Sequence, residues 1–199
     1  MPELRITTGR VEAVLLTPQD SRTSAARGEI KVDPEVGVLD DRHSGDRYVS
    51  KHDTALMAMG VPLRTHVNNV RHASVVSRHE LDAIAEAMGV PSPMPVGLLA
   101  ENIVVSDINS LTDLLMPGNL LEFRRSSDAP HPCAVLQVSA WIEPCMYPHR
   151  TIAEYFANGD RPFEPAKPFT AAAKNRRGVV CLVLVGGSIG PGDIMTVWQ

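Results

Sequence analysis

The chain has 199 residues, of which 44% are hydrophobic and 21% charged, a composition typical of folded globular proteins that excludes wholesale disorder and collagen-like or coiled-coil structures. The formal net charge of −4 argues against broad binding to nucleic acid or to anionic membranes. The longest strongly apolar run, residues 179–185, is far shorter than the roughly 20 residues that span a bilayer. We also find no secretory signal at the start, and we expect a single cytoplasmic domain over residues 1–199.

Glycine and proline punctuate the chain between short apolar segments, which is typical of a β-rich domain. Eight strands are predicted, at Arg10–Leu16, Glu29–Val32, Ser74–Val76, Asn102–Val105, Asn119–Phe123, Val135–Ile142, Val179–Val185 and Ile194–Trp198. Eight strands favour a mainly β fold, a closed or partly open β-barrel with a few peripheral helices. Residues 18–28, 50–70 and 157–176 lack clean periodicity and are expected to be long loops or loop-helix insertions, where functional sites usually lie.

Two segments carry helix signals. In the first, Ser77 and Glu80 form a capping-box pattern, an apolar face follows, and Gly89 ends the helix. The apolar face consists of Leu81, Ile84, Ala85 and Met88. The second helix is predicted to start with the same pattern at Thr151 and to run to Gly159.

Three cysteines without a C-x-x-C pair are expected to be free thiols. Cys145 follows a predicted strand between two prolines, and the nearby His149 and Arg150 would lower its pKa. A thiolate is what nucleophilic attack, persulfide carriage or soft-metal ligation requires, whereas a buried structural cysteine is the alternative. Cys181 is expected in the core, while Cys133 is a candidate second ligand or resolving thiol, although a whole strand separates it from Cys145.

A turn-like segment, residues 37–47, concentrates charge, histidine and glycine. The candidate ligands of a divalent metal are Asp40, Asp41, His43 and Asp46, but no recognised ligand spacing supports such a site. The pattern favours instead a polar loop that offers donors to an anionic ligand or pairs internally; the donors are Arg42, His43 and Arg47. Four of the seven histidines fall within residues 43–72, together with Arg71, which is consistent with one wall of a pocket or with a solvated face.

Two further polar positions adjoin predicted strands. Asn102 opens a strand, where its amide could read a ligand through paired hydrogen bonds or act as a turn residue. Arg176 and Arg177 form a cationic cluster with Lys174 before the most apolar strand, and this cluster could cradle a phosphate or form an exposed turn.

Taken in order, these segments resemble the MOSC family, named after the C-terminal domain of molybdenum cofactor sulfurase. The resemblance rests on Asp41-Arg42-His43-Ser44-Gly45, the strand and helix of 71–88, Glu101-Asn102-Ile103, Met116-Pro117-Gly118, Pro144-Cys145, and Arg176-Arg177-Gly178 through Gly192-Asp193. It covers nearly the whole chain, and the ordered set is far more specific than any member. It implies a β-barrel related to the barrel domain of pyruvate kinase.

The resemblance also implies that Cys145 is the family's functional cysteine, either a persulfide carrier or, as in the reductases of N-hydroxylated compounds, a ligand of molybdenum in the pterin cofactor (molybdopterin). Asn102 matches the asparagine that contacts the cofactor in those reductases, but Ala100 stands where they have an arginine. The residues expected to bind the cofactor are Asp41, His43, Arg71, Asn102, Arg176 and Arg177. All of them are expected to line one concave site with Cys145.

The length matches a stand-alone MOSC protein, so the aminotransferase-like domain of the sulfurases and its pyridoxal phosphate lysine are not expected. We expect a protein that handles sulfur or the molybdenum cofactor, together with a sulfur donor or an electron-transfer partner. One alternative is a molybdenum-dependent reductase, which would need an external electron donor because no flavin or iron–sulfur motif is present. The other is a non-catalytic carrier or binding protein.

Overall fold

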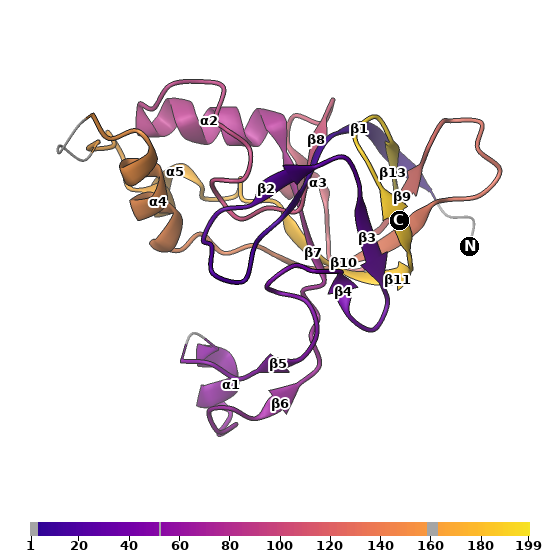
Figure 1. The fold of residues 1–199 in the computed structure, drawn as a ribbon, viewed down its shortest axis with the longest axis horizontal. Helices are drawn as coiled ribbons and strands as arrows, with labels where there is room; N and C mark the ends of the chain where they lie inside the picture. The colour runs from indigo at the N-terminus through magenta and orange to yellow at the C-terminus, as the bar shows by residue number, and fades with distance from the viewer. Residues whose placement is uncertain (1–3, 52, 159–162) are drawn as a thin grey trace.

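Within the residues described by the computed structural model, 4–51, 53–158 and 163–199, seven strands close into a β-barrel (Figure 1). In order around the barrel they are β13 (Ile194–Trp198), β9 (Leu120–Arg124), β10 (Ala134–Trp141), β11 (Val179–Val185), β7 (Ala73–Ser77), β8 (Ile103–Ser106) and β1 (Arg5–Leu16). Pairing of β1 with β13 closes the sheet, and β7 and β8 form a parallel pair among antiparallel neighbours. The predicted mainly β barrel is confirmed.

Seven of the eight predicted strands belong to this barrel, and the remaining one, β3 (Ile30–Asp33), lies outside it. It pairs with β4 (Gly37–Val38) and β12 (Gly187–Ile189), whereas β2 (Ala25–Arg27) extends the barrel sheet beside β1. A small lobe of β5 (Arg47–Tyr48), α1 (Thr54–Ala58) and β6 (His66–Val67) projects from the barrel at the bottom of Figure 1. All three stretches predicted to be long loops or loop-helix insertions, 18–28, 50–70 and 157–176, therefore contain a short strand or a short helix.

Three helices gather on one side of the barrel, at the left of Figure 1: α2 (Arg78–Met88), α4 (Tyr147–Tyr155) and α5 (Phe169–Ala172). Helix α3 (Leu111–Leu114) lies nearer the middle of the view and contacts β7. Helix α2 begins and ends as predicted, because the Ser77 hydroxyl accepts a hydrogen bond from the Glu80 N–H at 3.4 Å and Gly89 adopts a left-handed φ of 69°. The capping box is nevertheless incomplete, since the Glu80 carboxylate accepts hydrogen bonds from Thr112 instead. None of the described helices has the length and apolar character needed to cross a bilayer.

Helix α4 corrects the second helix prediction. It begins at Tyr147 rather than Thr151, because Pro148 suits the first turn of a helix, where its missing N–H is not needed. Thr151 lies inside the helix, and its hydroxyl donates to the Tyr147 carbonyl at 3.4 Å. The predicted end at Gly159 lies outside the described residues. As a result, Cys145 lies directly before the N-cap residue of α4, Met146.

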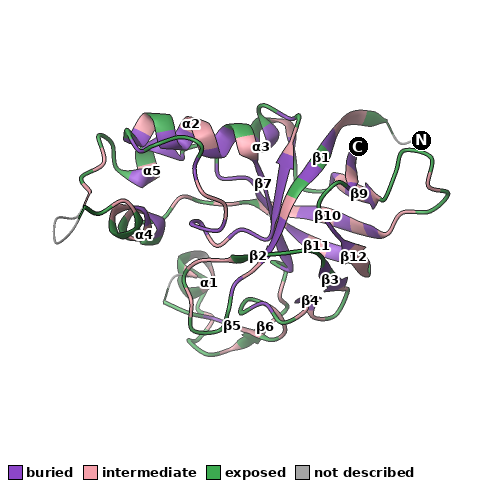
Figure 2. Cartoon of the chain, turned by 45° about the horizontal axis from the view of Figure 1, so that its top comes forward, coloured by how far each residue is buried: buried purple, intermediate pink, exposed green. Residues whose placement is uncertain are grey.

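Side chains alternate between two cores, as the period of a β-strand requires. Val75 points into the barrel, where Phe123 is fully buried, and Val76 points outward to the core beneath α2 and α5. Figure 2 shows this as buried positions along the strands and on the helix faces toward them. Cys181 lies in the barrel core, as predicted.

Gly178 precedes β11 at a place where no side chain fits. Its φ is +77°, and a Cβ built there would lie 2.2 Å from the Val75 carbonyl oxygen. We expect Gly178→Ala to destabilise the protein by at least about 2 kcal/mol more than Gly118→Ala, because overpacking adds to the strain of a positive φ. Gly118 is the matched control, since its φ is +101° but its Cβ position is open. Urea unfolding measures both variants, and equal losses of stability would contradict the packing argument.

Candidate functional site

Asp41 is the centre of a buried hydrogen-bond network. Its Oδ2 accepts from the Thr17 N–H at 2.7 Å and from Asn102 Nδ2 at 2.9 Å. Its Oδ1 accepts from the His43 N–H at 2.9 Å and lies 3.1 Å from His43 Nδ1. Burial by itself raises the pKa of Asp41, but the hydrogen bonds from His43 and Thr17 outweigh it and hold the pKa below its ordinary value. Asp41 is therefore an ionised, structurally fixed carboxylate.

Asn102 ties three strands together at one end of the barrel. Its Oδ1 accepts from the Ser74 N–H at 3.0 Å and from the Ser74 hydroxyl at 3.1 Å. Its Nδ2 donates to Asp41 and, at 3.4 Å, to the Leu15 carbonyl. Both groups of the amide thus have partners within the protein, so Asn102 fixes the position of Asp41 in this structure.

His43 is the accessible member of this network. Its side chain is 55% exposed, and the contact between Nδ1 and Asp41 orients the imidazole ring. When a carboxylate contacts one nitrogen of an imidazole, it fixes the ring orientation and leaves the other nitrogen free to bind a ligand or a proton. His43 Nε2 is therefore available for chemistry, whereas Asp41 and Asn102 supply its support.

Cys145 is exposed and lies at the N-terminus of α4. No side chain caps this helix, so the positive end of its dipole faces the residues that precede it. Helix N-termini attract negative charge, that of a thiolate included. The sequence prediction attributed this role to nearby cations, and it missed the helix terminus because it placed the start of the helix four residues too late, at Thr151.

The two cations expected beside Cys145 are engaged elsewhere. Arg150 is exposed and donates to Glu154 at 2.7 Å along α4. His149 Nδ1 accepts a hydrogen bond from the Phe169 N–H at 3.3 Å, which requires that nitrogen to be unprotonated.

Arg177 is the cation that the structure places near Cys145. Its side chain is buried, and Nη2 donates to the Leu99 carbonyl, but Nη1 has no hydrogen-bond partner among the described residues. Burial lowers the pKa of Arg177, while the negative charges of Glu101 and Cys145 oppose that shift. A buried guanidinium with an unpaired donor attracts an anion.

Glu101 builds the loop that holds Arg177. Its buried carboxylate accepts from the backbone N–H groups of Gly97 and Leu99, the latter at 3.0 Å. The loop of residues 97–101 thereby presents the Leu99 carbonyl to Arg177. Sequence reasoning named Glu101 only as part of the Glu101-Asn102-Ile103 motif and gave it no role of its own, although a carboxylate beside Asn102 at the start of a strand was the available signal.

The remaining predicted cofactor-binding residues lie elsewhere. Arg71 is exposed and lies near Asp53, whose pKa is lowered first by the hydrogen bonds from Ser50 and least by the charge of Arg71. Arg176 is exposed and lines a polar pocket beside α2. The structure therefore brings Asp41, His43 and Asn102 into one network and places Arg177 near Cys145; a shared pocket for all six residues and Cys145 stays a prediction.

The other two cysteines differ sharply from Cys145. Cys181 is fully buried, and burial raises the pKa of its thiol. Cys133 is half-buried at the opposite end of β10, and burial together with the Asp193 carboxylate raises its pKa. The eight-residue strand β10, about 25 Å long, lies between Cys133 and the segment of Cys145, and the role of Cys133 as a second ligand or resolving thiol stays a prediction.

A seven-stranded barrel with an accessible cysteine at a helix N-terminus and a buried arginine near it defines a β-barrel domain with a thiol site. The model of the MOSC domain matches residues 62–196, and the chain belongs to the MOSC domain family. YuaD of Bacillus subtilis, whose name refers to metal-sulfur cluster biosynthesis, is 34% identical over 133 residues, which span 67% of this chain and 63% of that protein.

Solved structures agree with this assignment. The crystal structure of YuaD superposes with a TM-score of 0.81 and 26% identity, covering 99% of this chain and 98% of YuaD. YiiM of Escherichia coli superposes with a TM-score of 0.53 and 13% identity over 94% of this chain and 69% of its own. The likeness to YiiM supports the fold alone.

We expect Cys145 to react first with iodoacetamide, Cys133 later, and Cys181 only after unfolding. The reason is that Cys145 is exposed, whereas burial raises the pKa of the other two thiols. Timed alkylation followed by peptide mass spectrometry measures the order. Labelling of Cys133 or Cys181 before Cys145 in the folded protein would sink the assignment.

We expect Asp41→Asn to lower the free energy of unfolding by about 1–3 kcal/mol at pH 7. The NH2 group of asparagine would then face N–H donors that now bind the carboxylate. The folded pKa of Asp41 is lowered, so its stabilisation is present above the ordinary aspartate pKa of about 3.9 and is lost as pH falls through the folded pKa. The difference in the free energy of unfolding between the variant and the wild type should therefore become smaller in acid. Urea unfolding at pH 7 and pH 3 measures it, with the exposed Asp128→Asn as control; a gap that widens in acid would contradict the prediction.

Proposed function

We propose that this MOSC-domain protein handles sulfur or the molybdenum cofactor through Cys145, as a persulfide carrier or as a ligand of molybdenum. One observation carries the proposal: an exposed thiol at the N-terminus of α4 lies near Arg177, whose Nη1 is buried and unpaired within the described residues. A thiolate, a persulfide or an anionic group of a bound cofactor would satisfy that donor.

Sulfur transfer needs only groups that this site offers. The Cys145 thiolate attacks the outer sulfur of a donor persulfide, R–S–SH. A new S–S bond forms at Cys145, the S–S bond of the donor breaks, and the donor leaves as the thiolate R–S⁻. One persulfide replaces another without net oxidation or reduction. The α4 N-terminus and Arg177 stabilise the negative charge of the attacking thiolate. The name of the relative YuaD refers to metal-sulfur cluster biosynthesis, and this supports the proposal of sulfur chemistry for the present chain.

The molybdenum cofactor fits the same donor set. Cys145 would ligate the metal, and Arg177 and the oriented His43 would hold anionic oxygens; when bound, the cofactor supplies two-electron redox chemistry. Ala100, with a φ of 57°, stands where the reductases that this sequence resembles have an arginine, so the cation of that position is missing. Arg71, Arg176 and Asn102 stay proposed contacts to the pterin and its phosphate.

The proposal includes partners and a compartment. A persulfide-bearing sulfur donor is required for sulfur carriage, and an electron-transfer partner for the reductase alternative. Three free cysteines suit a reducing environment such as the cytoplasm.

Elemental and mass analysis tests the proposal. Wild type, Cys145→Ala and the control Cys133→Ala are purified from cells that make the molybdenum cofactor, and molybdenum is measured by plasma mass spectrometry. Each protein is also treated with a small-molecule persulfide and weighed intact. We expect molybdenum, or a gain of one sulfur removed by a thiol reductant, on wild type and Cys133→Ala but not on Cys145→Ala. The absence of both from wild type, or equal loading of Cys145→Ala, would overturn the proposal.

Arg177 is tested in the same assays. Arg177→Gln removes the buried cation, and we expect it to lower the loading of Cys145 several-fold, whereas Arg27→Gln, at an exposed position outside the site, should leave it unchanged. Circular dichroism confirms that both variants fold. Equal loading of the two variants would contradict the role of Arg177.

A further inference from the structure

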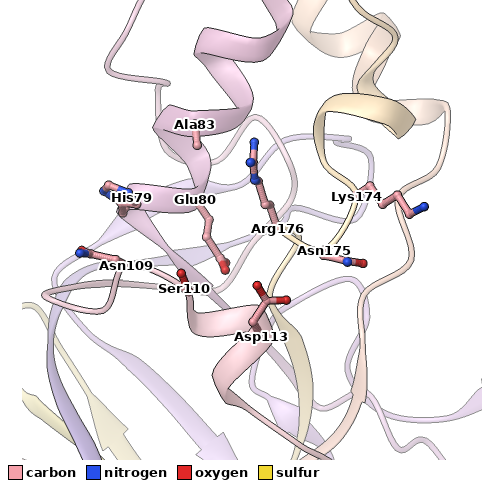
Figure 3. Close-up of a pocket in the computed structure, with 9 residues that line it drawn as sticks. All are labelled: His79, Glu80, Ala83, Asn109, Ser110, Asp113, Lys174, Asn175 and Arg176. Carbon is pink, nitrogen blue, oxygen red and sulfur yellow. The ribbon is translucent and has the colours of Figure 1, made fainter.

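A polar pocket opens between the first turn of α2, helix α3 and the turn before β11 (Figure 3). Its volume is about 350 Å³, near the lower end for ligand pockets, so a small metabolite is the appropriate size of occupant. A second hollow of about 470 Å³ adjoins it across Asp113, Lys174 and Asn175. This second hollow extends past Trp141 to Pro144.

Charges of both signs line the pocket, and no salt bridge joins them within the described part of the chain. Burial raises the pKa of Glu80, and the hydrogen bonds from Thr112 and the charge of Arg176 oppose that shift. Figure 3 shows the carboxylates of Glu80 and Asp113 directed into the space between α2 and α3. The Arg176 side chain lies between Glu80 and Lys174 in this view. Among the ion pairs of the described residues, none includes Asp113, Arg176 or Lys174. Unpaired opposite charges around one small cavity select a ligand that carries both charges, because an anion alone would face two carboxylates and an amine alone would leave Arg176 unmatched.

Glu80 is a built part of this pocket. Only 3% of its surface is exposed, and its two carboxylate oxygens accept hydrogen bonds from the Thr112 N–H and hydroxyl, each at 2.8 Å. These bonds fix the carboxylate in place while leaving further acceptor capacity on both oxygens. A preorganised acceptor of this kind costs a ligand little ordering entropy.

Trp141 supplies a rigid apolar surface in the adjoining hollow. Its indole N–H donates to the Thr112 carbonyl at 3.1 Å and to the Leu115 carbonyl at 2.8 Å. The residue nevertheless stays 47% exposed. A fixed, half-exposed indole suits contact with an apolar or aromatic side chain.

We propose that this pocket binds a free α-amino acid with an apolar side chain. The ammonium group lies between Glu80 and Asp113, the carboxylate pairs with Arg176, and the side chain extends over Trp141. The proposal goes beyond the function of Cys145: Glu80, Asp113 and Trp141 take no part in the thiol site, and of these groups Arg176 alone is also a proposed contact of the pterin.

Calorimetric titration with L-phenylalanine tests the proposal, using two analogues that each lack one charge. L-phenylalaninamide lacks the carboxylate, and N-acetyl-L-phenylalanine lacks the ammonium. We expect a Kd below about 1 mM for L-phenylalanine and at least ten-fold weaker binding of either analogue. Absence of heat up to about 10 mM amino acid, or equal binding of the three compounds, overturns the proposal.

Two variants test whether the amino acid binds in this pocket. Asp113→Asn and Arg176→Gln should each weaken L-phenylalanine binding at least ten-fold, while Asp128→Asn and Arg27→Gln, at exposed positions outside the pocket, should not. Binding should also change the tryptophan fluorescence, and Trp141→Phe should abolish that change while calorimetry still detects the ligand. Unaltered affinity in both pocket variants would show that an amino acid binds elsewhere and would refute this site.

Discussion

The hydrogen bond from Asn102 to Asp41 connects the segment that carries His43 to the start of β8. Without it, the Asp41 carboxylate would keep its donors from Thr17 and His43 but would be a buried charge short of one donor. A buried charge is tolerated only when its oxygens are satisfied, and Asp41 meets this condition with donors from three parts of the chain. Such a carboxylate keeps its charge and its place together, which is why His43 can be both exposed and oriented.

The same strand start also organises the other half of the site, because successive residues of an extended chain point in opposite directions. Asn102 turns toward Asp41, and Glu101 turns toward the backbone of the 97–101 loop. That loop in turn gives Arg177 its carbonyl partner. Two adjacent residues thus support the imidazole of His43 on one side and the guanidinium near Cys145 on the other.

The sequence was most informative where one periodic signal acted alone. All eight predicted strands exist because apolar alternation within short segments reflects burial directly, although β3 joins a small separate sheet whose pairing no local pattern records. The start of α4 was misplaced because Thr151 and Glu154 form a capping pattern, while the stronger local determinant was Pro148.

The division of roles between neighbouring charged residues was beyond sequence reasoning for a different reason. Arg176 and Arg177 are adjacent and chemically identical, and only tertiary packing makes one exposed and the other buried. The amide of Asn102 could have faced a ligand or the protein, and the partner that decided it, Ser74, is distant in sequence. Secondary-structure periodicity tells which face of an element is apolar, but it does not tell which polar groups meet across the fold.

Thr112 shows how these parts of the molecule are joined mechanically. Its hydroxyl donates to Glu80 and accepts from the Gly178 N–H at 2.8 Å, and its carbonyl accepts from the Trp141 indole. Gly178 has no room for a side chain and follows Arg177 directly. The hydrogen bond from its N–H therefore attaches Thr112 to the backbone beside the buried guanidinium. Through Thr112, Glu80 of the polar pocket and the backbone next to Arg177 of the thiol site are therefore joined by two hydrogen bonds.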